Sequence, residues 1–192
     1  MNSTTDPAGG ASRRRRAPLT IAVGVVLLLA GCVGSPSPSP SPSASAASLL
    51  GVTCSELVPV PVVDALHPNM KLNPHYKPME GTYPAKIAKL GGLACEWRAP
   101  DGVALEVAAA KLDKKTLAAN EARVAAGSTV TLVFGEAPEI RGYYANSGGT
   151  VTGDLEVFTE TGYWLSAVSP LFFTASDAEA VVASMLQALP SG

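Results

Sequence analysis

The sequence predicts an α+β domain in which helices pack on one face of an antiparallel β-sheet. Apolar and polar residues alternate over 93–98 and over 103–107, on either side of an Asp-Gly turn, as in a hairpin with one buried face. Apolar residues near the end of the chain recur at helical spacing. A hairpin followed by a helix occurs twice in this order, which suggests a hairpin–helix unit that is used twice.

The first half of the domain begins with short helical segments and continues into the hairpin. Its predicted elements are a helical turn over 54–59, a helix over 61–66 with Pro61 near its start, an ordered loop over 66–84, the two strands joined by a turn at 99–102, and a helix capped by Asp113 and closed by Gly127. Four prolines in the 66–84 segment are the reason for predicting a loop there.

The second half of the domain is predicted to form strands followed by a helix. Its predicted strands cover 129–134, 140–146, 151–159 and 163–168, and Thr161-Gly162 turns the chain between the last two. Ser176-Asp177-Ala178-Glu179 is interpreted as a capping box that opens the final helix. The buried stripe of that helix is predicted to be Val181, Val182, Met185, Leu186 and Leu189.

Residues 1–31 have the pattern of a signal peptide. Four arginines at 13–16 precede an uncharged apolar run over 17–30. This run is shorter than the roughly 20 apolar residues that a membrane-spanning helix needs. It ends in the sequence LAGC, which resembles the lipobox of bacterial lipoproteins, where diacylglycerol alkylates the cysteine thiol before cleavage leaves that cysteine as the first residue.

The lipobox makes Cys32 the predicted lipidation site, with acyl chains such as palmitate, and it places the protein on the extracytoplasmic face of the cell membrane. Two acyl chains attach a protein lastingly, whereas one chain is marginal. A plain secretory signal with an incidental cysteine is the alternative. The arginine run also fits a twin-arginine export signal, so the export route stays open.

Residues 32–48 are predicted to be a linker between the anchor and a single folded domain over 49–192. Repeated Ser-Pro pairs and a Ser/Ala run offer little to bury, and their prolines lack amide donors, which favours an extended polyproline-II path. The linker would reach roughly 50 Å at about 3.1 Å per residue. Such a segment is expected to be a spacer, and it can also carry O-linked sugar.

The charge of the chain excludes one class of partner. Four of the 14 Lys+Arg residues lie at 13–16 and one of the 16 Asp+Glu residues is Asp6, which leaves 10 basic and 15 acidic residues from Cys32 onward, a net charge of about −5. Nucleic-acid phosphates are bound by clusters of lysine and arginine side chains. We therefore expect no nucleic-acid partner.

Two cysteines, Cys54 and Cys95, remain once Cys32 is assigned to the lipid. Outside the membrane the compartment permits disulfides, so these two are predicted to bridge each other. A pair of free thiols is the alternative. A bridge across a loop of this size stabilises a domain by about 4 kcal/mol in the chain-entropy model.

The run TCSELVP at 53–59, followed by Cys95-Glu96-Trp97 on a strand and an Asp-Gly turn, resembles the small cell-envelope lipoproteins of high-GC Gram-positive bacteria. The resemblance covers residue 49 to the end, and the chain departs from it in the long proline-rich loop before Gly91. It implies a short cysteine-bearing helix bridged to a Cys-x-Trp strand. The family has no agreed activity, so the resemblance adds no site residue.

The sequence contains no recognisable catalytic motif. GxSxG, HExxH, CxxC and a phosphate-binding glycine loop are all absent, and the two histidines share one loop. Glu136 and Glu139 form a close acidic pair that is expected to be solvated. We therefore predict no catalytic residue, no cofactor and no enzyme, with an unrecognised carboxylate site as the alternative.

Two further groups of side chains are candidate sites. Imidazole and thioether groups suit copper, and the loop holds four of them: His67, Met70, His75 and Met79. The spacing matches no metal motif, so they are weak candidates. A second group could line a ligand groove, although packing against the sheet is the expected role: Tyr143, Tyr144, Tyr163 and Trp164.

These observations predict a membrane-anchored extracytoplasmic binding or accessory domain. Its predicted partners are the membrane, through the anchor, and a protein or small molecule that the sequence does not identify. The alternatives are an enzyme with a carboxylate site, a copper-binding envelope protein that uses the His/Met loop, and a purely structural role.

Overall fold

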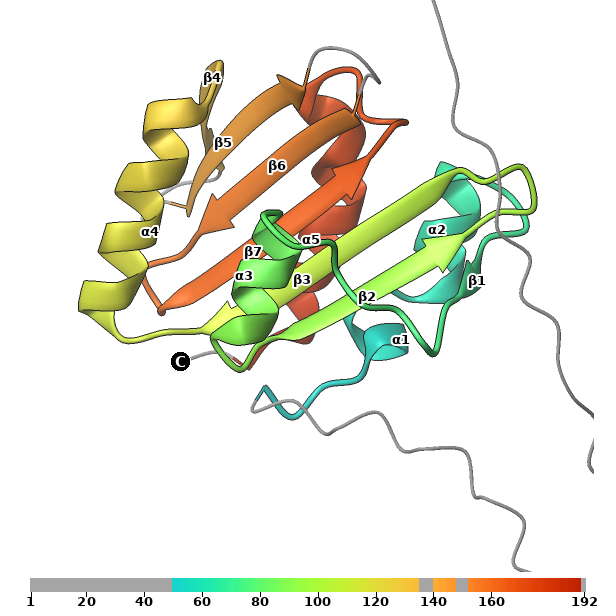
Figure 1. Ribbon diagram of the computed structural model, residues 1–192, viewed down its shortest axis with the longest axis horizontal. Coiled ribbons are helices and arrows are strands. Elements are labelled where there is room, and N and C mark those ends of the chain that lie inside the picture. Colours follow the sequence, from blue (N-terminus) through green and yellow to red (C-terminus); the bar gives the residue numbers. More distant parts are fainter. Residues whose placement is uncertain (1–49, 135–139, 148–151, 191–192) are drawn as a thin grey trace, which may run out of the picture. The chain divides into compact units, whose positions relative to one another are not determined.

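The computed structural model describes residues 50–134, 140–147 and 152–190, which form a seven-stranded antiparallel sheet with helices packed against it (Figure 1). The predicted α+β class is confirmed. The strand order is β1-β2-β3-β7-β6-β5-β4, so β3 and β7 meet at the centre of the sheet. The predicted signal peptide, the linker with Cys32, and the acidic pair Glu136 and Glu139 lie outside the described residues.

The elements follow the predicted order closely. The strands are β1 (Lys71–Leu72), β2 (Leu93–Arg98), β3 (Ala104–Lys111), β4 (Val130–Phe134), β5 (Ile140–Ser147), β6 (Thr152–Phe158) and β7 (Tyr163–Ser169). The helices are α1 (Cys54–Leu57), α2 (Val60–Leu66), α3 (Tyr83–Lys89), α4 (Lys114–Gly127), the 3-10 helix η1 (Ala175–Ala178) and α5 (Glu179–Ala188).

Helices cover both faces of the sheet, whereas the sequence analysis placed them on one. In Figure 1, α3 and α4 lie in front of the strands, on what we call the front face, and α1, α2 and α5 lie behind them, on the rear face. Successive strand residues point to opposite faces, so Val107 joins the rear core and Ala108 the front cluster. The central strands β3 and β7 are buried at most positions, and a sheet with two apolar faces needs a cover on each.

The hairpin–helix order does recur along the chain, as β2–β3–α4 and β6–β7–α5. The two helices nevertheless pack on opposite faces: α4 lies on the front with Leu117 and Val124, and α5 on the rear with Val181 and Met185. The order of elements is therefore repeated, but the packing of the unit is not.

A disulfide between Cys54 and Cys95 joins α1 to β2, as predicted, with the two Cα atoms 5.8 Å apart. Thr53 caps α1 by accepting a hydrogen bond from the Glu56 amide, and Glu56 accepts one from the Thr53 amide in return. Leu57 of α1 is fully buried in the rear core. The bridge and the cap together fix the start of the folded domain against the sheet.

The proline-rich segment contains two elements that the sequence analysis did not predict. Strand β1 is a two-residue edge that pairs with β2, and α3 starts at Tyr83, where Thr82 caps the helix and Pro84 occupies its first turn. Proline is favoured at that position because its missing amide would have no helical partner. The proline counted as a helix breaker therefore marks a helix start.

The cap of the C-terminal helix is also shifted from its predicted place. The capping box consists of Thr174 and Asp177, and it opens η1, which leads directly into α5. The predicted stripe packs inward, with Val181, Val182, Met185 and Leu189 buried and Leu186 partly buried. Among the described residues, we find no helix with the length and apolar character needed to cross a membrane.

Candidate functional site

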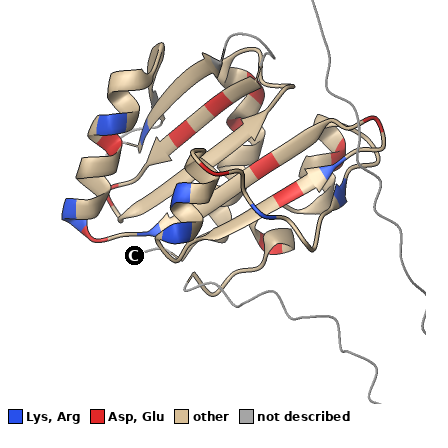
Figure 2. Ribbon diagram, in the orientation of Figure 1, with Lys and Arg blue, Asp and Glu red and all other residues tan. Residues whose placement is uncertain are grey.

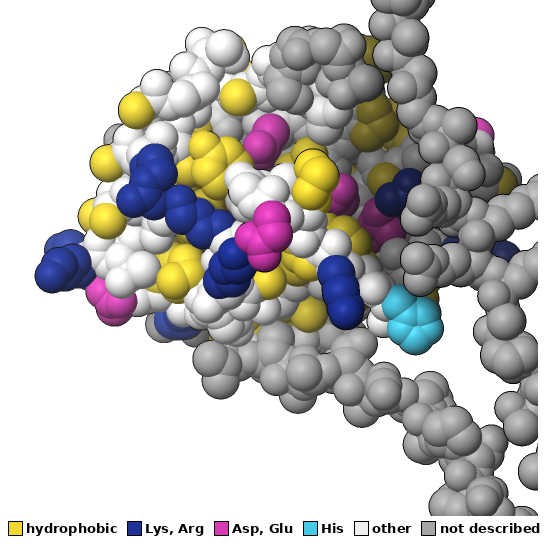
Figure 3. All heavy atoms as spheres, viewed as in Figure 1, with side chains coloured by type: hydrophobic (Ala, Val, Ile, Leu, Met, Phe, Trp, Pro, Cys, Tyr) yellow, Lys and Arg dark blue, Asp and Glu magenta, His cyan; other side chains and the backbone are white. Residues whose placement is uncertain are grey.

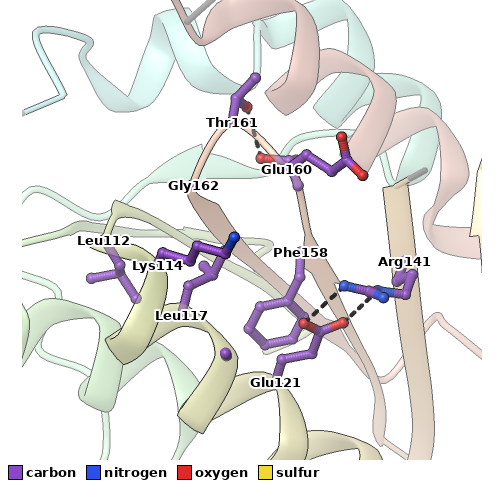
Figure 4. Close-up of a pocket in the computed structure, with 11 residues that line it drawn as sticks. Leu112, Lys114, Leu117, Glu121, Arg141, Phe158, Glu160, Thr161 and Gly162 are labelled. Atoms are coloured by element: carbon purple, nitrogen blue, oxygen red, sulfur yellow. Dashed lines mark hydrogen bonds and ion pairs between the residues drawn. The ribbon is translucent and has the colours of Figure 1, made fainter. Parts of the chain in front are cut away.

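A cleft of about 530 Å³ opens on the front face, between the first half of α4 and the turn that joins β6 to β7 (Figure 4). We call it the α4 cleft. Its lining residues are Leu112, Lys114, Leu117, Ala118, Glu121, Arg141, Phe158, Thr159, Glu160, Thr161 and Gly162. The volume lies within the range of about 300–1,000 Å³ that is typical of small-molecule sites.

The start of α4 positions Lys114 at the cleft. Asp113 caps the helix because its Oδ1 accepts hydrogen bonds from the amides of Lys115 and Thr116, each at 3.0 Å. Helical geometry then sends neighbouring side chains in different directions, and Lys114 points into the cleft (Figure 4). None of the described residues forms an ion pair with Lys114, so its ammonium group is available to a ligand.

The β6–β7 turn forms another wall and is held by local hydrogen bonds. Gly162 has a φ of +95°, a conformation that favours glycine, and its carbonyl accepts a bond from the Leu112 amide at 2.9 Å. The hydroxyl of Thr159 accepts a bond from the Tyr163 amide at 3.0 Å and contacts the Thr161 hydroxyl at 2.9 Å. The turn therefore presents two hydroxyl groups on a fixed backbone.

Arg141 stands on the far side of the cleft and is oriented by Glu121. The Nε atom of Arg141 lies 2.6 Å from Oε1 of Glu121, and its second terminal nitrogen donates to Oε2 at 3.2 Å. The Tyr143 hydroxyl also donates to Glu121, at 2.9 Å, and burial together with this carboxylate raises the pKa of Tyr143. The Arg141 side chain is 49% exposed, so its remaining N–H groups can reach a ligand.

The floor of the cleft is Phe158, which is only 2% exposed. Its ring stacks on Trp164, with the ring centroids 5.5 Å apart, and meets Tyr143 edge-on at 5.9 Å. In Figure 4 the Phe158 ring lies between Lys114 and Arg141. Around this apolar floor the cleft carries the unpaired Lys114, the Arg141–Glu121 ion pair and Glu160 at its rim, and the free ammonium group and the remaining N–H groups of Arg141 suit an anion with an apolar part.

Beside this floor, on the same front face of β6, lie two acids two residues apart: Asp154, which is half-buried, and Glu156, which is buried. Glu156 is 1% exposed and accepts a hydrogen bond from the indole nitrogen of Trp164. Burial raises the pKa of Glu156 well above its ordinary value, and the charge of Asp154 and a hydrogen bond with it raise it further. Burial also raises the pKa of Asp154, although its hydrogen bond with Glu156 opposes this.

The front face carries an uneven distribution of charge. Figure 2 shows acidic residues on β2, β3 and β6, and Figure 3 shows basic side chains gathered over α3 and α4. Two of the acids are well supplied with donors, because Asn73 and Arg98 donate to Glu96 and Tyr76 donates to Glu106 at 2.5 Å. In Asp154 and Glu156, by contrast, one carboxyl oxygen each, Oδ1 and Oε1, has no hydrogen-bond partner.

The four copper candidates lie in different surroundings. His67 pairs with Asp101, at 3.3 Å, and His75 is exposed. Met70 is buried in the rear core, whereas Met79 is 72% exposed. Within the described part of the chain, no group of three or more His, Cys, Asp or Glu residues could hold a metal ion.

The four aromatic candidates do not line one groove. Tyr143 and Trp164 belong to the front cluster, while Tyr144 and Tyr163 belong to the rear core. All four are buried, in agreement with the predicted packing role.

No pattern in the sequence points to Lys114, Arg141 or Phe158, because the cleft is assembled from α4, β5, the end of β6 and the β6–β7 turn. No local motif connects these segments. A signal for the buried acids was present in the stretch GDLEVF, where Asp154 and Glu156 sit two apart on a predicted strand and so share a face.

Comparisons with known proteins found no match to any family model, curated protein or solved structure.

Proposed function

We propose that this chain is a membrane-anchored extracytoplasmic binding protein whose folded domain holds a small organic anion in the α4 cleft. The observation that carries the proposal is the placement of Lys114 and Arg141 on either side of the buried Phe158 ring. The anchor is proposed from the lipobox that ends at Cys32 and from the Ser-Pro linker that follows it.

The lining chemistry supports an anion with an apolar part. A carboxylate or phosphate would accept hydrogen bonds from the Lys114 ammonium and from the N–H groups of Arg141 that do not bind Glu121. The apolar part would cover Phe158 and Leu117, and the hydroxyl groups of the β6–β7 turn would take any polar substituent.

The same residues support binding rather than catalysis. Glu121 is held by Arg141 and Tyr143, so its carboxylate has no free role in proton transfer. The buried acids Asp154 and Glu156 do not line the cleft. An enzyme with a carboxylate site would need such a pair to reach its substrate.

Charge reversal at Lys114 tests the binding proposal. We expect benzoate, octanoate or phenyl phosphate to raise the melting temperature of the full chain saturably, because a ligand that binds only the folded state stabilises it. Lys114→Glu should weaken that binding by about ten- to a hundredfold, the loss expected for one charge-assisted hydrogen bond.

Lys115→Glu is the matched control, since it makes the same charge change one residue further along α4, at a side chain that does not line the cleft. It should leave the effect of the probes unchanged. Equal losses in the two variants, or no stabilisation of the unaltered chain by any of the three probes, would contradict the binding proposal.

The anchor is tested separately by replacing Cys32 with Ser. Without the thiol there is nothing to acylate, so the variant should no longer be labelled by radioactive palmitate and should appear outside the membrane fraction. A variant that stays labelled, or that stays in the membrane fraction after high-salt and carbonate washes, would contradict the anchor.

A further inference from the structure

We propose that Asp154 and Glu156 share one proton and that this proton controls ligand binding in the α4 cleft. The control of binding rests on the function proposed above, whereas the shared proton does not. Carboxyl oxygens on the front face of β6 lack hydrogen-bond partners, and a chain of contacts leads from these acids to the floor of the cleft.

Three buried side-chain oxygens in the described residues lack a hydrogen-bond partner when carboxyl groups are counted as acceptors only: Asp154 Oδ1, Glu156 Oε1 and Ser166 Oγ. The three belong to one cluster. Asp154 and Glu156 are neighbours on the front face of β6, and Ser166 lies opposite Glu156 on β7. Buried polar groups are rarely left unpaired, so this concentration of unpaired atoms needs a physical cause.

A proton on Glu156 would provide hydrogen-bond partners for two of the three unpaired oxygens. The indole nitrogen of Trp164 already occupies Oε2 of Glu156. A protonated Oε1 becomes a donor to Oδ1 of Asp154, so two of the three unpaired atoms gain a partner at once. Two ionised carboxylates side by side at this position would instead repel each other.

The charged groups around Asp154 and Glu156 favour the retention of one proton by the pair. Glu106 on β3 adds negative charge and raises the pKa of Asp154. Lys86 on α3 lies over the Trp164 ring, 6.0 Å from its centroid; burial and the charge of Arg123 on α4 lower the pKa of Lys86, and the charge of Glu156 opposes this.

Two tyrosines complete the surroundings of the pair. Tyr83 on α3 meets Trp164 edge-on at 6.0 Å, and Tyr143 on β5 lies opposite Glu156 but donates to Glu121. Burial raises the pKa of both phenols, so neither loses its proton before the acids do.

A short series of contacts connects the pair to the cleft. Glu156 accepts the indole N–H of Trp164, the Trp164 ring stacks on Phe158, and Phe158 is the floor of the cleft. Loss of the shared proton places a second negative charge beside this floor, next to the carboxyl group that accepts the indole N–H. An organic anion in the cleft would then bind less well, so its affinity should fall as pH rises.

The indole of Trp164 provides a direct readout. In a Trp97→Phe background, Trp164 is the single remaining tryptophan of the chain. We expect the 15N–1H indole signal of the detergent-solubilised full chain to titrate with a midpoint well above 4.5, the ordinary pKa of glutamate. The amide signals of Thr161 and Gly162 at the cleft should titrate with the same midpoint.

Glu156→Gln should abolish both titrations, because the amide keeps an acceptor for the indole and carries no titrating proton. Asp154→Asn is the second variant, at a partly exposed position, in case the first does not fold, and it should remove the partner's charge and lower the midpoint. Asp64→Asn, which neutralises an exposed acid of α2 on the rear face, is the control and should leave the midpoint unchanged.

An indole signal that does not titrate above the ordinary carboxyl range would overturn the shared proton. An indole that titrates while the cleft amides do not would overturn the coupling to the cleft. Failure of the probe anions to bind, with both titrations intact, would contradict the proposed function and leave the proton pair standing.

Discussion

Gly153, at the start of β6, shows how one residue can decide whether two segments meet. A Cβ atom at this position would overlap the carbonyl oxygen of Phe172 and lie 2.6 Å from the Phe172 Cβ. Phe172 is fully buried in the rear core, so it cannot move aside freely. Gly153 is therefore required for close approach rather than for a turn.

Gly153→Ala should lower the free energy of unfolding by about 2–3 kcal/mol, since overpacking a filled core forces the backbone apart. Gly127→Ala is the control, because a Cβ there meets nothing within 4 Å and Gly127 ends a helix. That control should be neutral or stabilise by up to about 1 kcal/mol. Urea unfolding of the two variants measures the difference, and equal effects would refute the steric argument.

The buried Glu156 also makes stability depend on pH. Its pKa is raised in the folded state above its ordinary 4.5, so the folded protein holds a proton that the unfolded protein releases. The free energy of unfolding should therefore be greatest at or below pH 4.5 as far as this group is concerned, and should fall as pH rises toward the raised pKa, by at most about 1.4 kcal/mol per pH unit for one proton.

Glu156→Gln should flatten that part of the stability curve, because its side chain does not ionise. Urea unfolding at a series of pH values compares the variant with the unaltered chain. Parallel curves for the two proteins would show that Glu156 ionises as easily in the folded state as in the unfolded one.

Among the helices and strands, α1 is too short to be held by packing alone, and the disulfide attaches it to β2. A four-residue helix buries a single side chain, Leu57, so it depends on its cap and on the Cys54–Cys95 bridge to β2. The bridge closes a loop with a sequence separation of 41. It thus restricts the unfolded chain while it fixes the entry of the domain.

Replacing both cysteines with serine should lower the free energy of unfolding by about 4 kcal/mol in the chain-entropy model. Adding a reducing agent to the unaltered chain should have a similar effect and should not alter the double variant. Chemical denaturation with and without reductant makes the comparison. A melting profile that neither the substitutions nor the reductant alters would mean that the bridge contributes nothing.

Elements with clear periodicity or a recognised cap were predictable from the sequence, and those set by strand pairing or by a proline in the first helical turn were not. The alternation over β2 and the Asp113 cap of α4 gave elements within one or two residues of their observed bounds, whereas β3 runs to Lys111, past its predicted end at Val107. Strand β1 exists only because β2 is beside it. Helix α3 was missed because Pro84 was weighed as a breaker and not as a first-turn residue.

In the molecule as a whole, the α4 cleft could not be predicted from the sequence, because its walls come from segments that are far apart along the chain. Lys114 is on α4, Arg141 on β5 and Phe158 on β6, and the strand order β7-β6-β5 brings them together. Composition and the export pattern predict where such a protein is located. They carry no information about which cation lies next to which aromatic ring.

Binding of a small organic anion in the α4 cleft is the proposal to test first. Native mass spectrometry of the chain, extracted in mild detergent from its own membrane, tests it most directly. We expect a lipidated, disulfide-bonded protein with one bound small anion, which Lys114→Glu loses and Lys115→Glu retains. A bare chain, or a bound molecule that persists in Lys114→Glu, would contradict the claim.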